Sequence, residues 1–239
     1  MHHTLLLFDI DGTILNANGA GLRAWSKTAK SHFDDDFTVK NVQFAGNLDS
    51  IIYREAAEHN KIENHHEHHE AFKKAYIKAL DEELKQQKTH VHDGIGQLIE
   101  RLNHMSTNDA PVMMGLLTGN YAKGAELKLE SAGIDPAWFA ITAYGDEAES
   151  RPDLTELAMK KYEAMMGIKA NPKRVIVIGD TPRDVDCAKA HGCCAFAVAT
   201  GSFTVEQLLD SGADYAVENL ADHSLLFEVM DKIMQNHGE

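Results

Sequence analysis

Short apolar segments, each followed by polar residues or glycine, constrain the fold of this chain more than any other feature. Four of them are typical of buried strands, and they cover residues 5–8, 112–117, 140–144 and 175–178. Residues 194–198 form a fifth segment of the same kind, and residues 215–217 are a candidate for a short edge strand. We therefore expect a sheet that is buried on both faces.

Helical patterns lie between these segments. Apolar residues recur at spacings of three and four over 122–132, 154–166 and 184–191, and a glycine follows each stretch. Strands that alternate with helices imply parallel β-α-β units, so we predict an α/β fold with helices on both faces of a parallel sheet. Such sheets bind ligands at the carboxyl ends of the strands, where Asp9, Thr118 and Asp180 fall.

The stretch between residues 16 and 89 breaks this alternation. Helical patterns dominate it, over 22–33, 48–59 and 66–84. This composition indicates a helical insertion rather than further β-α units. We therefore predict a core made of residues 1–15 and 90–239, with residues 16–89 forming an inserted helical cap domain above the strand ends.

The composition argues against several classes of function. A formal net charge of -14 would repel the backbone of a nucleic acid, so we expect no nucleic-acid partner. Apolar runs such as 5–8 are far shorter than the ~20 residues of a membrane span, so we expect no membrane partner either. Cys187, Cys193 and Cys194 have no Cys-x-x-Cys spacing, and we interpret them as reduced thiols of a cytoplasmic protein.

The segment Asp9-Ile10-Asp11-Gly12-Thr13 places two carboxylates at the end of the first predicted strand, before a glycine that permits an unusual turn. Such a pair attracts a divalent metal and can divide the work of phosphoryl transfer. One carboxylate attacks phosphorus, while the other protonates the leaving oxygen and later takes a proton from water. The alternative is a strand end followed by a polar turn.

Two other strand ends also carry polar residues. Thr118-Gly119-Asn120 offers a hydroxyl and backbone N–H groups to a phosphate oxygen, although an isolated segment of this kind is more often a helix cap. Asp180 and Asp184 are hard oxygen ligands that suit Mg²⁺. Asp184 could instead cap the following helix, whereas a buried Asp180 would need a compensating partner.

Together these motifs resemble the haloacid dehalogenase superfamily, specifically its phosphoglycolate-phosphatase-like members with a small helical cap. Residues 9–13 match the first family motif, Thr118 the second, and residues 179–184 the fourth. The resemblance implies a Rossmann-like three-layer core. It also implies a magnesium-dependent phosphatase that hydrolyses a small phosphorylated metabolite.

The resemblance implies a role for each of these aspartates. Asp9 would be the nucleophile that forms an aspartyl-phosphate, and Asp11 would be the acid and base. Mg²⁺ would be held by Asp9, the carbonyl of Asp11 and Asp180, with Asp184 assisting from nearby. The dehalogenases after which the superfamily is named look like they lack the second aspartate, because they have no leaving oxygen to protonate. The presence of Asp11 therefore favours phosphate chemistry over cleavage of a carbon–halogen bond.

The third family motif is usually a lysine, and here the matching segment offers Arg151. An arginine keeps the positive charge and can bind phosphate with two donors, although it differs from a compact ammonium group. Lys128 is an alternative source of this charge, on the predicted helix that follows Thr118. Because a lysine of an amphipathic helix usually faces solvent, we expect Lys128 to do so.

Other interpretations remain open or are weaker. A sugar-phosphate mutase of the same superfamily is the main alternative. Gly19, Gly21 and Ala24 imitate a dinucleotide fingerprint, but the next segment is a helix rather than the second strand. The histidines of 65–69 lack the His-Glu-x-x-His spacing, so we interpret them as a solvated cap face. Asn47 stands where related phosphatases often carry a basic residue, which argues against phosphoglycolate as the substrate.

Overall fold

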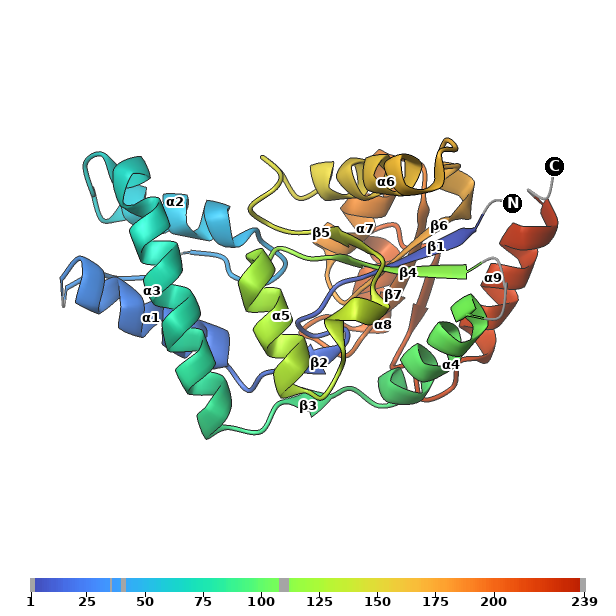
Figure 1. Cartoon of the computed structure of the whole chain (residues 1–239), viewed down its shortest axis with the longest axis horizontal. Coiled ribbons are helices and arrows are strands. Elements are labelled where there is room, and N and C mark those ends of the chain that lie inside the picture. Colours follow the sequence, from blue (N-terminus) through green and yellow to red (C-terminus); the bar gives the residue numbers. More distant parts are fainter. Residues whose placement is uncertain (1–2, 35, 40–41, 108–111, 237–239) are drawn as a thin grey trace.

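The computed structural model describes residues 3–34, 36–39, 42–107 and 112–236. Within them, a six-stranded parallel sheet has the order β5-β4-β1-β6-β7-β8 (Figure 1). The strands are β1 Thr4–Phe8, β4 Val112–Leu117, β5 Ile141–Ala143, β6 Val175–Gly179, β7 Cys194–Val198 and β8 Tyr215–Val217. All six predicted strands are confirmed, and their ends differ from the prediction by at most one residue.

Helices cover both faces of the sheet, which confirms the predicted three-layer α/β fold (Figure 1). Alternate residues of β1 point to opposite faces: Leu6 and Phe8 join one apolar cluster, and Leu5 and Leu7 join the other. The first face is covered by α4 Ile95–Thr107, α5 Ala122–Ser131 and α9 Ser224–Asn236. The second is covered by α6 Asp153–Met166, α7 Pro182–Ala190 and α8 Val205–Asp210.

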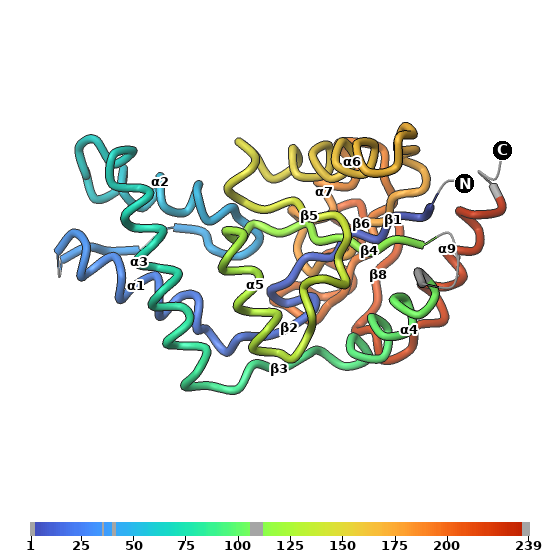
Figure 2. Tube along the Cα trace, viewed as in Figure 1, coloured from blue at the N-terminus to red at the C-terminus, as the bar shows by residue number. Residues whose placement is uncertain are grey.

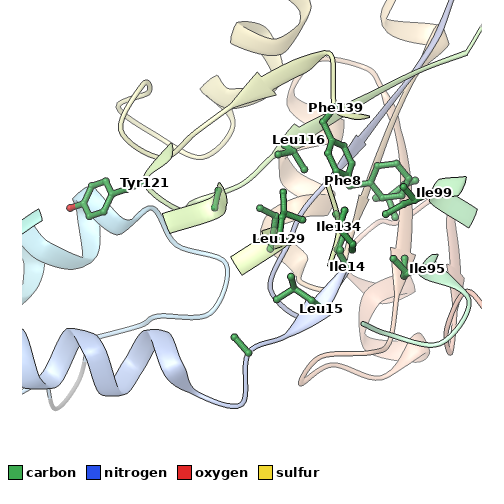
Figure 3. Packing of buried hydrophobic residues seen from close by; sticks show 14 of the residues in the cluster. Phe8, Ile14, Leu15, Ile95, Ile99, Leu116, Tyr121, Leu129, Ile134 and Phe139 are labelled. Atoms are coloured by element: carbon green, nitrogen blue, oxygen red, sulfur yellow. The ribbon is translucent and has the colours of Figure 1, made fainter. Parts of the chain in front are cut away.

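The apolar cluster that contains Leu6 and Phe8 brings the ends of several elements together near the carboxyl ends of the strands. Figure 3 shows Phe8 of β1 and Leu116 of β4 packed near Phe139, with Leu129 of α5 beside them. Tyr121, at the start of α5, lies apart from this group and toward the cap. The strand ends are therefore fixed by side chains that are fully or almost fully buried.

Three helices lie together beyond the carboxyl ends of the strands (Figures 1 and 2), namely α1 Ala20–His32, α2 Asp49–His59 and α3 His65–Gln86. Trp25 of α1 is 1% exposed, and its ring centroid lies 5.1 Å from that of Phe72 on α3 and 5.6 Å from that of Phe44. These helices confirm the predicted helical insertion, while its boundaries as a domain stay a prediction. None of the helices in the described ranges is long and apolar enough to cross a membrane.

A small antiparallel pair, β2 Leu15–Asn16 and β3 His90–Val91, joins the two places where the chain passes between sheet and cap (Figure 2). Leu15 pairs with Val91, and Asn16 pairs with His90. Each strand has two residues, so the pairing leaves no periodic pattern in the sequence. The pair holds the start and the end of the insertion side by side.

Candidate active site

A cavity of about 410 Å³ lies where the carboxyl ends of β1, β4 and β6 meet the cap. The strands end level with one another, because Phe8 pairs with Leu116 on one side and with Ile178 on the other. The residues that follow them are therefore brought together although they are far apart in the sequence. Most of the predicted site residues line this cavity: Asp9, Asp11, Thr118, Gly119, Asn120, Arg151 and Asp180.

A buried carboxylate cluster lies at the floor of the site. Each of Asp9, Asp180 and Asp184 offers a ligand oxygen, and these oxygens lie within 4.8 Å of one another. The three residues are only 4%, 4% and 2% exposed. The hydroxyl of Thr13 donates to Oδ1 of Asp180 over 3.1 Å. All three residues are predicted metal ligands, and the structure brings them together.

The electrostatics of this cluster fit a divalent cation. Burial raises the pKa of Asp9 to about 7, against the opposing effect of the nearby Arg151 guanidinium. Burial also raises the pKa of Asp180 well above its usual range, and the Asp184 and Asp9 carboxylates add to this. Carboxylates this close and this dry are stabilised as anions by a shared cation. Oxygen ligands alone are the set that Mg²⁺ prefers.

Two glycines without side chains make room for the Asp180 carboxylate. Gly12 has a φ of +82°, in the left-handed region that favours glycine, and a Cβ there would lie 2.4 Å from Oδ2 of Asp180. A Cβ at Gly201 would lie 1.7 Å from the same oxygen. Any larger residue at either position would displace the Asp180 carboxylate.

Arg151 is the cation beside the cluster. Its Nη2 lies 2.5 Å from Oδ1 of Asp184 and 3.1 Å from Oδ2 of Asp9, and the residue is 4% exposed. Burial opposes the charge, but the Asp184 and Asp9 carboxylates outweigh it and raise the pKa of Arg151 above its usual range. Its Nε has no hydrogen-bond partner among the described residues. Arg151 thus lies where the resemblance placed the third motif.

Lys128 is buried, so the expectation that it faces solvent is wrong. It is 5% exposed, and its Nζ donates to Oδ2 of Asp11 over 2.6 Å and to Oδ1 of Asn120 over 2.7 Å. The signal was present in the sequence, because Lys128 shares the spacing of the buried residues Ala125 and Leu129 on α5. A lysine inside an apolar stripe needs an anionic partner, and Asp11 is that partner.

The side chain of Asp11 points away from the carboxylate cluster. Its Oδ2 accepts hydrogen bonds from Lys128 and, over 2.8 Å, from Nδ2 of Asn120. The metal role that the resemblance implied for Asp11 belongs to its carbonyl and stays a prediction. Asp9 and Asp11 therefore have different surroundings, as the predicted division between a nucleophile and an acid-base requires.

The loop that follows β4 is packed tightly. Thr118 is fully buried, and its Oγ1 accepts a hydrogen bond of 2.8 Å from Nδ2 of Asn120. The N-cap of α5 is Tyr121, so Thr118 does not have the helix-capping role considered as its alternative. A Cβ at Gly119 would lie 2.0 Å from the carbonyl oxygen of Asn47, so the cap loop can approach only a glycine. Phosphate binding by this loop stays a prediction.

Asp184 has the helix-capping role that the sequence left open, and it also lies in the carboxylate cluster, while its role as a metal ligand stays a prediction. Its Oδ2 accepts from the backbone N–H of Thr181 over 3.0 Å and from the Thr181 hydroxyl over 2.7 Å, which forms a capping box at the start of α7. Its Oδ1 faces Arg151 and the carboxylate cluster. This capping box therefore fixes the orientation of the Asp184 carboxylate.

The cap supplies the opposite wall of the cavity and one carboxylate that sequence analysis missed. Asp49, at the start of α2, has a backbone N–H that donates to the carbonyl of Gly119 over 2.8 Å. Its Oδ2 accepts from the backbone N–H of Tyr121 over 2.8 Å. Burial raises the pKa of Asp49 to about 6, with Lys128 acting in the opposite direction. An acid in the first turn of a helix is common, so nothing in the sequence marked Asp49 as a site residue.

The wall also contains apolar side chains, including Leu22, Trp25, Phe44 and Ile52. Asn47 is 6% exposed, and its amide group is occupied by the carbonyl of Gln43 and the backbone N–H of Leu48.

Two weaker motifs of the sequence, the histidines of 65–69 and the glycines before α1, lack the features of a ligand site in the part of the chain that the structure describes. His66 and His68 are exposed as expected, but His69 is partly buried, and its Nε2 lies 2.8 Å from the hydroxyl of Tyr121. Within the described ranges, the carboxylate cluster is the only group of three or more possible metal ligands. Helix α1, which follows Gly19, leads to another helix, so the second strand of a dinucleotide site does not follow it.

Comparisons with known proteins agree with this architecture. The model of the family described as haloacid dehalogenase-like hydrolase matches residues 6–198. Pyrophosphatase PpaX of Anoxybacillus flavithermus is 22% identical over 223 residues, which cover 93% of this chain and 95% of that protein. Pyrophosphatase PpaX of Listeria monocytogenes is 23% identical, over 92% of this chain and 94% of that protein.

Solved structures give the same fold. A hydrolase from Pseudomonas syringae has a TM-score of 0.71 at 18% identity and covers 95% of this chain and 98% of its own. CbbY from Rhodobacter sphaeroides, in complex with phosphate, has a TM-score of 0.67 at 18% identity, with coverage of 92% and 96%. The expectation of an enzyme of this superfamily is confirmed. This chain belongs to the haloacid dehalogenase-like hydrolase family.

Proposed function

We propose that this chain is a magnesium-dependent phosphatase that hydrolyses a small phosphomonoester through an aspartyl-phosphate on Asp9. The observation that carries the proposal is the contrast between two carboxylates two residues apart. Asp9 is buried beside Arg151 and two further carboxylates, whereas Asp11 faces a separate pair of donors. Environments that differ in this way suit a nucleophile and an acid-base.

In the first step, a carboxylate oxygen of Asp9 attacks phosphorus, and the bond between phosphorus and the leaving oxygen breaks. Asp11 gives its proton to that oxygen, so the product leaves as an alcohol. In the second step, Asp11 takes a proton from water while the water oxygen attacks phosphorus. The bond between phosphorus and Asp9 then breaks, which releases phosphate and restores both side chains.

Two positive charges support these steps in our proposal. The guanidinium of Arg151 favours the ionised form of Asp9, and it lines the cavity, where it would bind a phosphate oxygen. Asp9, Asp180 and the carbonyl of Asp11 would hold Mg²⁺, with Asp184 nearby. The bound ion would neutralise charge on the carboxylate and the phosphate, so that the two anions can approach.

The substrate is a small phosphorylated metabolite in this proposal. The curated relatives are named pyrophosphatases, and a structure of CbbY contains xylulose-1,5-bisphosphate, so phosphate esters and anhydrides both belong in a screen. Sugar phosphates in the same screen test the mutase alternative, because a mutase yields an isomeric sugar phosphate rather than free phosphate. A cytoplasmic location fits the free thiols of Cys187, Cys193 and Cys194.

Replacement of the nucleophile tests the function. Asp9→Asn should abolish Mg²⁺-dependent release of phosphate from an aryl phosphate, and a chelator should do the same to the wild type. Asp210→Asn is a matched control, since Asp210 is an exposed aspartate at the end of α8. Wild-type turnover by the Asp9→Asn variant would refute the assignment of the nucleophile.

A further inference from the structure

One oxygen of Asp11 is held by two donors from the core. Oδ2 accepts from Nζ of Lys128 at 2.6 Å and from Nδ2 of Asn120 at 2.8 Å. Nζ of Lys128 also donates to Oδ1 of Asn120 at 2.7 Å, which closes a triangle of three side chains. Because an ammonium group has no acceptor, the amide of Asn120 must turn its oxygen to Lys128 and its NH₂ to Asp11. We call these three residues the Asp11 clamp.

Lys128 and Asn120 of the clamp are buried, whereas Asp11 is exposed to the cavity. The side chain of Lys128 is 6% exposed, whereas that of Asp11 is 45% exposed and lines the cavity. Asn120 is 6% exposed, and its Nδ2 is tied to the Thr118 hydroxyl as well. Oδ1 of Asp11 has no hydrogen-bond partner among the described residues, so it remains available to a ligand in the cavity.

The cap closes over the ammonium group. A Cβ built on Gly21 of α1 would lie 3.7 Å from Nζ of Lys128 and 3.6 Å from the hydroxyl of Tyr76 on α3. The glycine therefore lets the cap backbone approach Lys128 closely. The buried ammonium group needs an anionic partner, and the half-exposed carboxylate of Asp11 is that partner.

We propose that Lys128 is a positioning residue for the proton transfers of Asp11. With Asn120 it fixes Oδ2, so that Oδ1 is the atom that gives a proton to the leaving oxygen and later takes one from water. The inference rests on the proposed function, to which it adds a residue that acts through Asp11. A lysine that served only the stability of α5 would have no such effect.

A positioning role and a purely structural role of Lys128 predict a different dependence of the reaction rate on the leaving group. An alcohol is a poor leaving group and needs the proton, whereas 4-nitrophenolate leaves without it. General acid catalysis contributes about 10²- to 10⁴-fold when a proton is needed. Misplacement of Asp11 should therefore slow an alkyl phosphate much more than 4-nitrophenyl phosphate. A purely structural defect should slow both equally.

The experiment compares kcat/KM for glycerol phosphate and 4-nitrophenyl phosphate in Lys128→Met. We use kcat/KM because it reports the first step, in which the leaving group departs. The ratio of the two values does not depend on the fraction of folded enzyme in the sample. Lys123→Met is the matched control, because Lys123 lies on the same helix with its side chain 56% exposed.

We expect Lys128→Met to lose at least about tenfold more activity on glycerol phosphate than on 4-nitrophenyl phosphate. Lys123→Met should keep the wild-type ratio. If Lys128→Met does not fold, Asn120→Ala replaces it, since it removes the other donor of the clamp, and the same change of ratio is expected.

Equal losses on both esters would overturn the inference and leave the proposed function intact. A wild-type enzyme that hydrolyses neither ester, nor any other phosphate in the presence of Mg²⁺, would overturn the proposed function and the inference with it.

Discussion

Replacement of Arg151 by methionine tests the electrostatic design of the site. Arg151, Asp9 and Asp184 are almost completely buried, with side chains 4%, 5% and 3% exposed, so solvent screens their charges little. The variant leaves two buried carboxylates without their cation. Loss of one partner from a buried pair costs about 3–5 kcal/mol. For a chain of this size we expect a midpoint of thermal unfolding roughly 10 °C lower.

The assay is urea unfolding with and without Mg²⁺. Arg54→Met is the matched control, because Arg54 is exposed on α2, and it should change the free energy of unfolding by less than about 0.5 kcal/mol. If the carboxylate cluster binds the ion, Mg²⁺ should stabilise Arg151→Met more than the wild type, since it supplies the missing positive charge. A loss below about 1 kcal/mol without metal would refute the reasoning.

Further predictions concern the cap carboxylate and the metal ligands. Burial raises the pKa of Asp49 to about 6, so the folded protein keeps a proton that the unfolded chain has lost between about pH 4 and pH 6. The free energy of unfolding should therefore fall as pH rises through this window, by on the order of 3 kcal/mol, and Asp49→Asn should remove this part of the slope in urea titrations. An unchanged slope would contradict the burial argument. Asp180→Asn should weaken Mg²⁺ binding at least about tenfold by calorimetry, and unaltered affinity would exclude Asp180 as a ligand. Gly201→Ala places a methyl group 1.7 Å from Oδ2 of Asp180 and should lower the free energy of unfolding by about 1–3 kcal/mol, whereas Gly96→Ala, with no atom within 4 Å, should not.

The sheet and its polar strand ends were predictable because each depends on a local pattern. Apolar runs such as 112–117 locate buried strands, and parallel strands must present their carboxyl ends at one edge. The convergence of Asp9 and Asp180 follows from that geometry, whereas Arg151 was placed beside them by the resemblance to the third family motif. These elements carry their signal within a few residues of sequence.

Contacts that depend on distant partners were not predictable in the same way. The pairing of Leu15 with Val91 joins residues on either side of the insertion and leaves no periodic signal. The burial of Lys128 depends on Asp11, far away in the chain, although its place on the apolar stripe of α5 was visible. Asp49 became part of the site only because the cap folds over the loop that contains Gly119.

The central claim is that Asp9 carries the phosphoryl group between the two steps. The most direct test is to quench a turnover with acid within milliseconds and to locate the phosphoryl group by peptide mass spectrometry. The account predicts an adduct on Asp9 that is absent from Asp9→Asn and absent without Mg²⁺. A phosphoryl group on another residue, or rapid release of phosphate with no adduct at any time, would contradict it.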